Sequence, residues 1–380
     1  MFTVAIDARS ADSPRSGIGN YTTHLISELA RLDSEFQLLL IRRANPQASP
    51  SLDIDSKVRV ESYRGDTKSV STLGLGISLA KVLRNVDLYH SPADIVPLGL
   101  PCPWVVTLHD LMWVETPELC SSFLPVRLVN SLWYRWNFSR SVPGAASIIA
   151  ISRATADAIA RVYPQQRDKV HVVHHGVDHE RYSSKEQKPR SLLDPYLPRG
   201  MRYSLIVGQG SPYKNHLGMV RAFAEAMKDR SDHKLVLVRR FSRVDKEMHT
   251  LLERPEVKQK LISVPFVPDD VLLALYQHAH MLLFVSHNEG FGLPALEAMA
   301  LGTPVLASTA PAVVEVTGEG ALHVSSTDPS SMARGIVALD SDEALRERLQ
   351  KAGLQRSREF SWKRAAEQTL AAYRSALRGR

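Results

Sequence analysis

The sequence predicts an α/β protein with two doubly wound domains, each a parallel sheet covered by helices on both faces. Three observations predict this class. Short β-branched runs alternate with helical patterns along the first half of the chain, a polar stretch at residues 179–200 interrupts them, and the alternation then restarts. Parallel strands need crossover connections, commonly helices, so a repeated strand–helix order favours this architecture. A length of 380 residues suits two domains.

The first domain is predicted over residues 1–180. Its strands are short runs rich in β-branched and aromatic residues, and two helices between them have the spacing of apolar residues typical of one buried face. The strands are FTVAI (2–6), FQLLLI (36–41), KVRVE (57–61), VDLYH (86–90), WVVTL (104–108), SIIAI (147–151) and VHVVH (170–174), and the helices are GNYTTHLISELARL (19–32) and SRATADAIARVY (152–163).

A linker is predicted at 181–200, because this stretch is polar, charged, contains prolines and shows no strand pattern. The second domain is predicted over 201–360. Its strands are YSLIVG (203–208), KLVLV (234–238), LISVPF (261–266), MLLFVS (281–286), PVLAS (304–308) and ALHVS (321–325). Doubly wound sheets bind ligands beyond the carboxyl ends of their strands, so two such domains are expected to face each other across a binding cleft.

Composition and net charge limit the classes of binding partner that this protein is expected to have. Apolar residues make up 44% and charged residues 23% of the chain, which is typical of a globular protein. The net charge of +7 and the sequence pI of about 9.3 favour anionic partners. The sequence contains no zinc-finger spacing, basic zipper or aromatic–basic RNA motif, so nucleic acid is not an expected partner. Phosphorylated small molecules or a membrane surface explain the charge more simply.

A cytoplasmic location is expected. The two cysteines, Cys102 and Cys120, have no metal-type spacing and suit a reducing compartment. The start MFTVAIDARS is a short apolar strand followed by charge, unlike a secretory signal. No uninterrupted apolar run reaches the ~18 residues that a membrane-spanning helix needs.

The stretch SHNEGFGLPALEAMALGTPV (286–305) is the strongest functional signal. Glu289 follows a predicted buried strand, and Gly290 and Gly292 permit a tight turn and close approach by a ligand. Pro294 suits the first turn of a helix that runs to Gly302. The free N–H groups at such a helix start form an anion site suited to a diphosphate.

Glu297, about one turn into this helix, can accept hydrogen bonds from a vicinal diol such as a ribose. A glycine turn before a helix is also common in purely structural settings, and a lone glutamate on a helix often faces solvent. The spacing by itself is compatible with both interpretations.

This stretch resembles the signature of the retaining glycosyltransferases with the GT-B fold, the family related to bacterial mannosyltransferases and sucrose synthase. Other segments resemble the family in the expected order: AIDAR with SGIGNYTTHLISELA, VTLHDL, ISRATADAI, HHGVD and SPYKNHLGMVRAF. The end FSWKRAAEQTLAAYRSAL is similar to the family's terminal helix, which implies that residues 361–380 cross back onto the first domain.

The resemblance implies a role for each matching residue. Glu289 contacts the donor sugar, Lys214 neutralises the departing diphosphate, and His109 hydrogen-bonds the sugar, so these three are the expected catalytic residues. A compact ammonium suits the charge on the diphosphate. Whether Glu289 is a nucleophile or only positions the sugar stays open. The expected donor-binding residues are Gly17, Gly19, Gln209, Gly290, Phe291, Gly292, Leu293 and Glu297.

The sequence departs from the family pattern at three places. Gln209 stands where arginine or threonine is frequent, and Tyr213 stands where arginine is frequent. Arg239 and Arg240 follow the strand KLVLV where glycine is common. We hypothesise that Arg239 or Arg240 meets part of the diphosphate charge.

The expected function is transfer of a hexose, with retention, from a nucleotide sugar to a glycan or lipid-linked oligosaccharide, as in surface polysaccharide synthesis. GDP-mannose is the favoured donor, and UDP-glucose, UDP-GlcNAc or dTDP-rhamnose are alternatives. A sugar-nucleotide-binding protein without turnover is a more remote alternative, as is a phosphorylase-type enzyme with pyridoxal phosphate. No cofactor or metal is expected, because the sequence has no DxD-type motif at a strand end.

Two other segments have a structural and a functional interpretation. HVVHHGVDH (171–179) contains four histidines, which could suggest a zinc site. In a strand, however, His171 and His174 point to opposite faces, so no metal is assigned. FLPVRLVNSLWYRWNFSRS (123–141) mixes arginines with aromatic residues. It suits a helix packed on the first domain, or a helix lying peripherally on an anionic membrane.

Overall fold

The computed structural model describes residues 1–12, 16–32, 36–44, 58–65, 67, 69–239, 246–264 and 267–378. The chain forms two compact units. Unit 1 consists of Met1–Glu115, Val129–Gly176 and Ser361–Arg380, and unit 2 consists of Thr116–Leu128 and Val177–Phe360.

Unit 1 contains a seven-stranded sheet in the order β3-β2-β1-β4-β5-β6-β7, and every pairing is parallel. The predicted strands are therefore confirmed, with shifts of at most two residues at their ends. The bounds are β1 (Phe2–Asp7), β2 (Phe36–Arg43), β3 (Arg59–Tyr63), β4 (Leu88–Ser91), β5 (Trp104–Leu108), β6 (Ser147–Ala150) and β7 (Val170–Val172).

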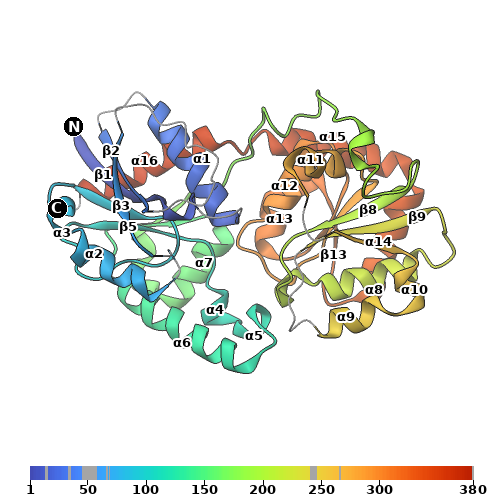
Figure 1. Cartoon of the computed structure of the whole chain (residues 1–380), viewed down its shortest axis with the longest axis horizontal. Helices are drawn as coiled ribbons and strands as arrows, with labels where there is room; N and C mark the ends of the chain where they lie inside the picture. Colours follow the sequence, from blue (N-terminus) through green and yellow to red (C-terminus); the bar gives the residue numbers. More distant parts are fainter. Residues whose placement is uncertain are drawn as a thin grey trace. The chain divides into compact units, whose positions relative to one another are not determined.

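Helices cover both faces of this sheet. Successive residues of a strand point to opposite sides, so a strand made of apolar residues needs a covering layer on each side. Val105 on β5 packs in the core formed with α1 and α16, whereas its neighbour Val106 packs in the core formed with α6 and α7 (Figure 1). The longer helices are α1 (Gly17–Arg31), α6 (Leu124–Ser141, of which the part from Val129 on belongs to unit 1), α7 (Arg153–Val162) and α16 (Trp362–Arg378), and the short ones are η1 (Ala8–Ser10), η2 (Val70–Gly74), α2 (Leu75–Ser78), α3 (Ala80–Leu83), α4 (Met112–Glu115) and η3 (Pro164–Lys169).

The C-terminal helix α16 belongs to unit 1, as the resemblance implied. It packs against α1, β5 and β6. A buried chain of hydrogen bonds fastens it. The hydroxyl of Tyr373 lies 2.7 Å from Nδ1 of His90, Nε2 of His90 lies 2.8 Å from Oγ1 of Thr107, and Thr107 lies 3.0 Å from the hydroxyl of Tyr21. Burial lowers the pKa of His90 to about 3, so its imidazole is neutral. The hydrogen-bonded row of Tyr373, His90, Thr107 and Tyr21 therefore carries no charge.

Unit 2 contains a six-stranded parallel sheet in the order β10-β9-β8-β11-β12-β13. All six predicted strands are present, which completes the two doubly wound sheets expected from the sequence. The bounds are β8 (Arg202–Val207), β9 (His233–Val238), β10 (Leu261–Val264), β11 (Met281–Phe284), β12 (Val305–Ser308) and β13 (Leu322–Val324).

Helices also cover the unit 2 sheet, and residues 177–200 pack onto α11 of the same unit. Gln277 of α11 accepts a hydrogen bond from the backbone N–H of Lys188 at 2.8 Å and donates one to the carbonyl of Glu186 at 2.7 Å. The helices are α5 (Pro117–Cys120), η4 (Arg190–Leu193), η5 (Pro212–Lys214), α8 (His216–Ala226), α9 (Lys246–Leu252), α10 (Pro255–Lys258), α11 (Asp269–Gln277), α12 (Leu293–Ala300), α13 (Pro311–Thr317), η6 (Gly318–Gly320), α14 (Pro329–Ser341) and α15 (Glu343–Ser357).

Candidate functional site

The strand order of unit 2 defines where a ligand site is expected. From β8 the chain adds β9 and β10 on one side, and it then adds β11, β12 and β13 on the other. The connections after β8 and β11 therefore run to opposite sides, and in doubly wound sheets a ligand is expected beyond the carboxyl ends of two such neighbouring strands. The segment with Lys214 follows β8, and the segment with Glu289 follows β11.

Lys214 and Glu289 meet at this point. The Nζ of Lys214 lies 2.7 Å from Oε1 of Glu289, and the hydroxyl of Ser286 donates to the same oxygen at 2.7 Å. The two charged side chains are only 12% and 8% exposed. The ammonium also lies 5.1 Å from the ring centre of Tyr213 and 5.4 Å from that of Phe284. The ion pair is thus preorganised in a partly desolvated environment, where charge interactions are stronger than in water.

Asn215 fixes the lysine segment against the glutamate segment. Its backbone is left-handed, with φ of 52°, a conformation that asparagine tolerates better than most residues. Its side-chain amide donates to the carbonyls of Val285 and Ser326 at 3.1 and 3.0 Å. A backbone hydrogen bond of 2.7 Å from His287 to Tyr213 joins the same two loops. Backbone contacts, rather than the ion pair alone, therefore set the position of Lys214.

The glycine turn leads into α12 as the sequence predicted. Gly292 has φ of +120°, a conformation that side chains rarely adopt, and it immediately precedes the first helical residue, Leu293. No side chain of the described residues caps this helix start. Phe291 is buried and meets Phe360 edge to face at 5.8 Å, while Gly290 and Leu293 are half-buried. The turn is thus anchored by an aromatic contact and presents backbone near the ion pair.

Glu297 on α12 is held by two tyrosines that sequence analysis did not single out. The hydroxyl of Tyr276, from α11, donates to Oε2 at 3.1 Å, and Tyr182 also hydrogen-bonds this carboxylate. Burial raises the pKa of Glu297 to about 7, although the tyrosine hydrogen bonds and Arg181 oppose the shift. A carboxylate has about four acceptor positions, so two tyrosines leave capacity for a diol.

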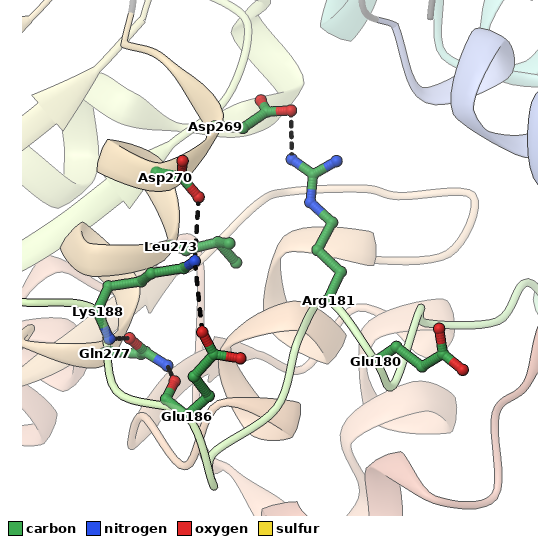
Figure 2. Close-up of a pocket in the computed structure, with 8 residues that line it drawn as sticks. All are labelled: Glu180, Arg181, Glu186, Lys188, Asp269, Asp270, Leu273 and Gln277. Carbon is green, nitrogen blue, oxygen red and sulfur yellow. Dashed lines mark hydrogen bonds and ion pairs between the residues drawn. The ribbon is translucent and has the colours of Figure 1, made fainter. Parts of the chain in front are cut away.

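A pocket of about 300 Å³ is lined by residues that include Arg181 and Gln277, the neighbours in sequence of these two tyrosines (Figure 2). Its residues come from the segment before η4 and from α11, and ion pairs join the two sides. Arg181 contacts Asp269 at 2.6 Å, and Lys188 contacts Asp270 at 3.2 Å. Arg181 directly precedes Tyr182, so the Arg181–Asp269 pair helps to hold Tyr182 against Glu297. The lining residues are Glu180, Arg181, Glu186, Lys188, Asp269, Asp270, Leu273 and Gln277.

Arg239 lies at the carboxyl end of β9, near the lysine segment. It is buried, and its Nη1 lies 3.4 Å from Nδ1 of His216. A Cβ on Gly210 would come within 1.9 Å of Nη2, so the glycine makes room for the guanidinium. Gln209, next to this glycine, is exposed. Arg240, the other arginine proposed to meet diphosphate charge, lies outside the described residues.

His109 lies in unit 1, directly after β5. Its Nε2 lies 2.8 Å from the carbonyl of Pro92, so this nitrogen carries the proton. Its backbone N–H donates to the carboxylate of Asp94 at 2.9 Å. Asp94 has φ of 67°, an uncommon conformation for a residue other than glycine. The ring of His109 meets Tyr21 edge to face at 5.2 Å. The histidine is thus rigidly oriented.

Gly17 and Gly19 lie at the start of α1, also in unit 1. The hydroxyl of Ser16 caps this helix by accepting from the N–H of Gly19 at 3.0 Å. A Cβ on Gly19 would lie 2.8 Å from the carbonyl oxygen of Ser10, so close packing requires glycine there. Gly17 is exposed, and no described atom lies within 4 Å of the position of a Cβ on it.

The candidate residues thus fall into two groups. Lys214, Glu289, the glycine turn and Glu297 are brought together in unit 2, while His109 and the two glycines lie in unit 1. Among the residues that the structure describes, no group of three or more His, Cys, Asp or Glu side chains is placed to hold a metal ion. The described helices include none with the length and apolar character to cross a membrane.

Two family models match the chain. Residues 195–356 match the glycosyl transferases group 1, and residues 15–181 match glycosyltransferase family 4. Together the matched ranges take in most of both units. The chain belongs to the group 1 glycosyltransferases with the GT-B fold, so it is a glycosyltransferase.

Similar proteins include mannosyltransferases. The O-antigen chain mannosyltransferase B of Escherichia coli is 27% identical over 388 residues, which cover 95% of this chain and 96% of that protein. The O-antigen chain mannosyltransferase RfbU of Salmonella typhimurium is 27% identical over 232 residues, covering 61% of this chain and 59% of that protein.

Solved structures share the fold over the whole chain. Sucrose-phosphate synthase from Thermosynechococcus elongatus aligns with a TM-score of 0.75 at 19% identity, covering 100% of both chains. A protein of Anabaena, solved in complex with UDP-glucose, aligns with a TM-score of 0.74 at 17% identity, covering 99% of this chain and 100% of that one.

Proposed function

We propose that this glycosyltransferase transfers mannose from GDP-mannose, with retention, to a glycan or lipid-linked oligosaccharide in the synthesis of a surface polysaccharide. The observation that carries the proposal is the ion pair of Lys214 and Glu289 at the switch point of the unit 2 sheet, 2.7 Å apart and largely desolvated. The names of the O-antigen mannosyltransferases that resemble the chain support the sugar and the pathway.

Lys214 and the start of α12 supply the stabilisation of charge. As the bond from the anomeric carbon to the diphosphate lengthens, negative charge gathers on the phosphate oxygens. A fixed ammonium and backbone N–H groups stabilise that charge without reorganising during the reaction. This arrangement provides the positive charge that a metal supplies in other enzymes, so we propose turnover without a metal ion.

Glu289 and Glu297 are proposed to accept hydrogen bonds from the two sugars of the donor, the transferred hexose and the ribose. Before the donor binds, Glu289 accepts hydrogen bonds from Lys214 and Ser286. We assign the hydroxyls of the transferred sugar to Glu289 and the ribose diol to Glu297, whose tyrosine partners hold the carboxylate in one orientation. His109, Gly17 and Gly19 of unit 1 are assigned to the sugar and phosphates from the resemblance.

UDP-glucose is the second candidate donor. Its specific support is the Anabaena structure with bound UDP-glucose, which shares the fold at 17% identity. The mannosyltransferase relatives are more similar in sequence, at 27% identity, and they therefore favour GDP-mannose.

A donor panel tests the proposal directly. The Tm of the protein is measured with GDP-mannose, UDP-glucose, UDP-GlcNAc and dTDP-rhamnose, and sugar release to water is then followed with the best binder, with and without EDTA. A selective rise in Tm with GDP-mannose, followed by release of mannose that EDTA does not reduce, is expected. A preference for another nucleotide sugar would change the donor, and nucleotide binding without any turnover would favour a binding protein.

The anomeric configuration of the product tests retention. NMR of the transferred sugar should show the α-configuration of GDP-mannose preserved. An inverted product would contradict the proposed mechanism while leaving the assignment of the donor intact.

A further inference from the structure

Helix α6 (Leu124–Ser141) carries an apolar face that points into solvent. Five side chains line one side of this helix, four of them repeating every fourth residue and the fifth, Val129, lying beside them, and we call them the outer face of α6. Its members and their exposed fractions are Leu124 (50%), Leu128 (55%), Val129 (67%), Leu132 (68%) and Trp136 (45%). Phe123, just before the helix, is 52% exposed. A helix at a protein surface normally turns such a stripe toward the core.

The inward side of the same helix is largely polar. Ser131, Asn137 and Ser141 are buried together with Phe138. The amide of Asn137 donates to the carbonyl of Asp94 at 3.2 Å, which explains why a polar residue is tolerated there. The usual arrangement is therefore reversed: α6 is attached to unit 1 by polar contacts and a few apolar ones, and its leucines are left outside. Figure 1 shows α6 at the periphery of the unit, beside α7.

The charge around this face is positive. Between Glu118 and Asp157 the sequence contains four arginines, Arg127, Arg135, Arg140 and Arg153, and no acidic residue. Glu115, which precedes this stretch, is paired with Arg161 at 2.9 Å.

Two of the arginines are held in place by the protein. Arg135 donates to the carbonyl of Val114, and Arg140 donates to the carbonyls of Val96 and Pro97. The guanidinium of Arg140 also lies 5.4 Å from the ring centre of Trp136. These arginines are consequently fixed beside the outer face, and these hydrogen-bond partners are backbone carbonyls rather than carboxylates.

We infer that the outer face of α6 docks on an anionic membrane surface. Leucines and a tryptophan that face outward, with two fixed arginines on the same helix and no acidic residue between Glu118 and Asp157, match the interfacial helix that lies in the plane of a bilayer. Anionic lipid headgroups complement the arginines, and the net charge of +7 adds attraction at longer range. A second copy of this chain would bring the same arginines against each other, so the charge favours lipid.

This inference goes beyond the proposed function and does not depend on the donor. Docking would bring the enzyme to a lipid-linked acceptor, but vesicle binding itself needs neither donor nor catalysis. The membrane test and the donor test can therefore fail separately.

Flotation of the full chain with vesicles tests the inference. Wild-type protein is expected to float with vesicles of phosphatidylglycerol and phosphatidylcholine, and to do so weakly with phosphatidylcholine alone or in high salt. The variant Leu128→Gln/Leu132→Gln keeps residues that form helices well, and we expect its vesicle affinity to fall about tenfold or more. The matched control is Val314→Gln/Val337→Gln, which alters two exposed valines on α13 and α14 and should float like the wild type.

Tryptophan fluorescence locates the contact independently. Vesicles should shift the emission of wild-type protein to shorter wavelength, and the shift should be smaller in Trp136→Phe. Equal flotation of the Gln variant and wild type would overturn the inference. So would a wild-type dimer in sedimentation equilibrium that the Gln variant dissociates, without vesicle binding by either protein, because the outer face would then bind a second copy.

Discussion

Unit 1 and unit 2 have the same order of their first six strands, yet the ion pairs beside their switch points differ in exposure. In unit 2, a partly exposed ion pair of Lys214 and Glu289 follows strands β8 and β11. In unit 1, the corresponding strands are β1 and β4. The ion pair after β1, between Asp7 and Arg9, is buried and its two charges cancel, at 2.7 Å between Oδ2 and Nη2.

The residues around His109 continue this difference. Tyr21, His109 and His175 form a buried ring cluster, with His175 stacked on Tyr21 at 4.8 Å. Burial and neighbouring histidines lower the pKa of His175 well below its ordinary value. Unit 1 thus has a buried ion pair and a buried ring cluster here, whereas unit 2 has an ion pair that keeps some exposure. One strand order fixes where a site forms, while the loop residues decide what it can bind.

The largest effect is expected from Lys214→Ala in unit 2. Removing the ammonium leaves the developing diphosphate charge unstabilised, so turnover should fall about 10²–10³-fold, as for the loss of one fixed donor to a reaction's developing anion. The measurement is kcat at saturating donor. Lys228→Ala removes an exposed lysine that pairs with Glu225 in the same unit, and it should leave kcat unchanged. Near-normal turnover of Lys214→Ala would contradict the assigned role.

Tyr373→Phe tests the neutral network of unit 1. The substitution removes the partner of Nδ1 of His90 in a fully buried position, so the free energy of unfolding should fall by about 1–3 kcal/mol. Nucleotide affinity should stay unchanged, since the nucleotide is assigned to unit 2. Denaturant unfolding and a binding titration check the two halves of this prediction, and a large loss of affinity would show that the units are not independent in this respect.

Glu297→Gln is expected to raise the stability of the fold at high pH and to weaken nucleotide binding. Burial raises the pKa of Glu297 from 4.5 to about 7, so the folded chain binds the proton more tightly than the unfolded chain. Stability contributed by this group therefore falls as the pH rises from about 4.5 to about 7. The variant should have a higher Tm than wild type above pH 7 and a similar Tm below about pH 4.5.

The same variant should bind nucleotide about tenfold more weakly, because an amide accepts hydrogen bonds from a diol less well than a carboxylate. Wild-type affinity should rise with pH as Glu297 ionises near pH 7, and the variant should lose this rise. An affinity that follows the same pH curve in both proteins would place the ribose elsewhere.

The smallest effect on stability is expected from Gly17→Ala. No described atom lies near the added methyl group, so the free energy of unfolding should change by less than about 0.5 kcal/mol. Gly19→Ala is the matched comparison, since its methyl group would lie 2.8 Å from the carbonyl oxygen of Ser10 and should destabilise the fold by about 1–3 kcal/mol. A fall in kcat for Gly17→Ala at unchanged Tm would support its assigned approach to the donor.

Much of the fold was predictable because parallel strands buried on both faces have a local signature. MLLF and LLLI are continuous apolar runs, and each lies in a strand. The turn before α12 was predictable for a similar reason, since the φ of +120° at Gly292 requires glycine and Pro294 suits the first turn of a helix.

The partners of the site residues were not predictable in this way. Tyr182 and Tyr276 lie 115 and 21 residues before Glu297 in the chain, and nothing near them signals a carboxylate. Asn215 resembles an ordinary helix cap in the sequence, but its side chain joins two loops that are separated by about 70 residues. The reversed polarity of α6 also needed the structure, because the apolar content of a helix does not reveal which side packs.

The sequence by itself determined the two sheets, the glycine turn and the family of the chain, because these depend on residue types at short spacing. Only the tertiary structure decided that Lys214 and Glu289 share one ion pair, that two tyrosines hold Glu297, and that the leucines of α6 face solvent. Hydrogen bonds, burial and pKa shifts arise between residues far apart in the chain, and the packing of the elements sets those distances.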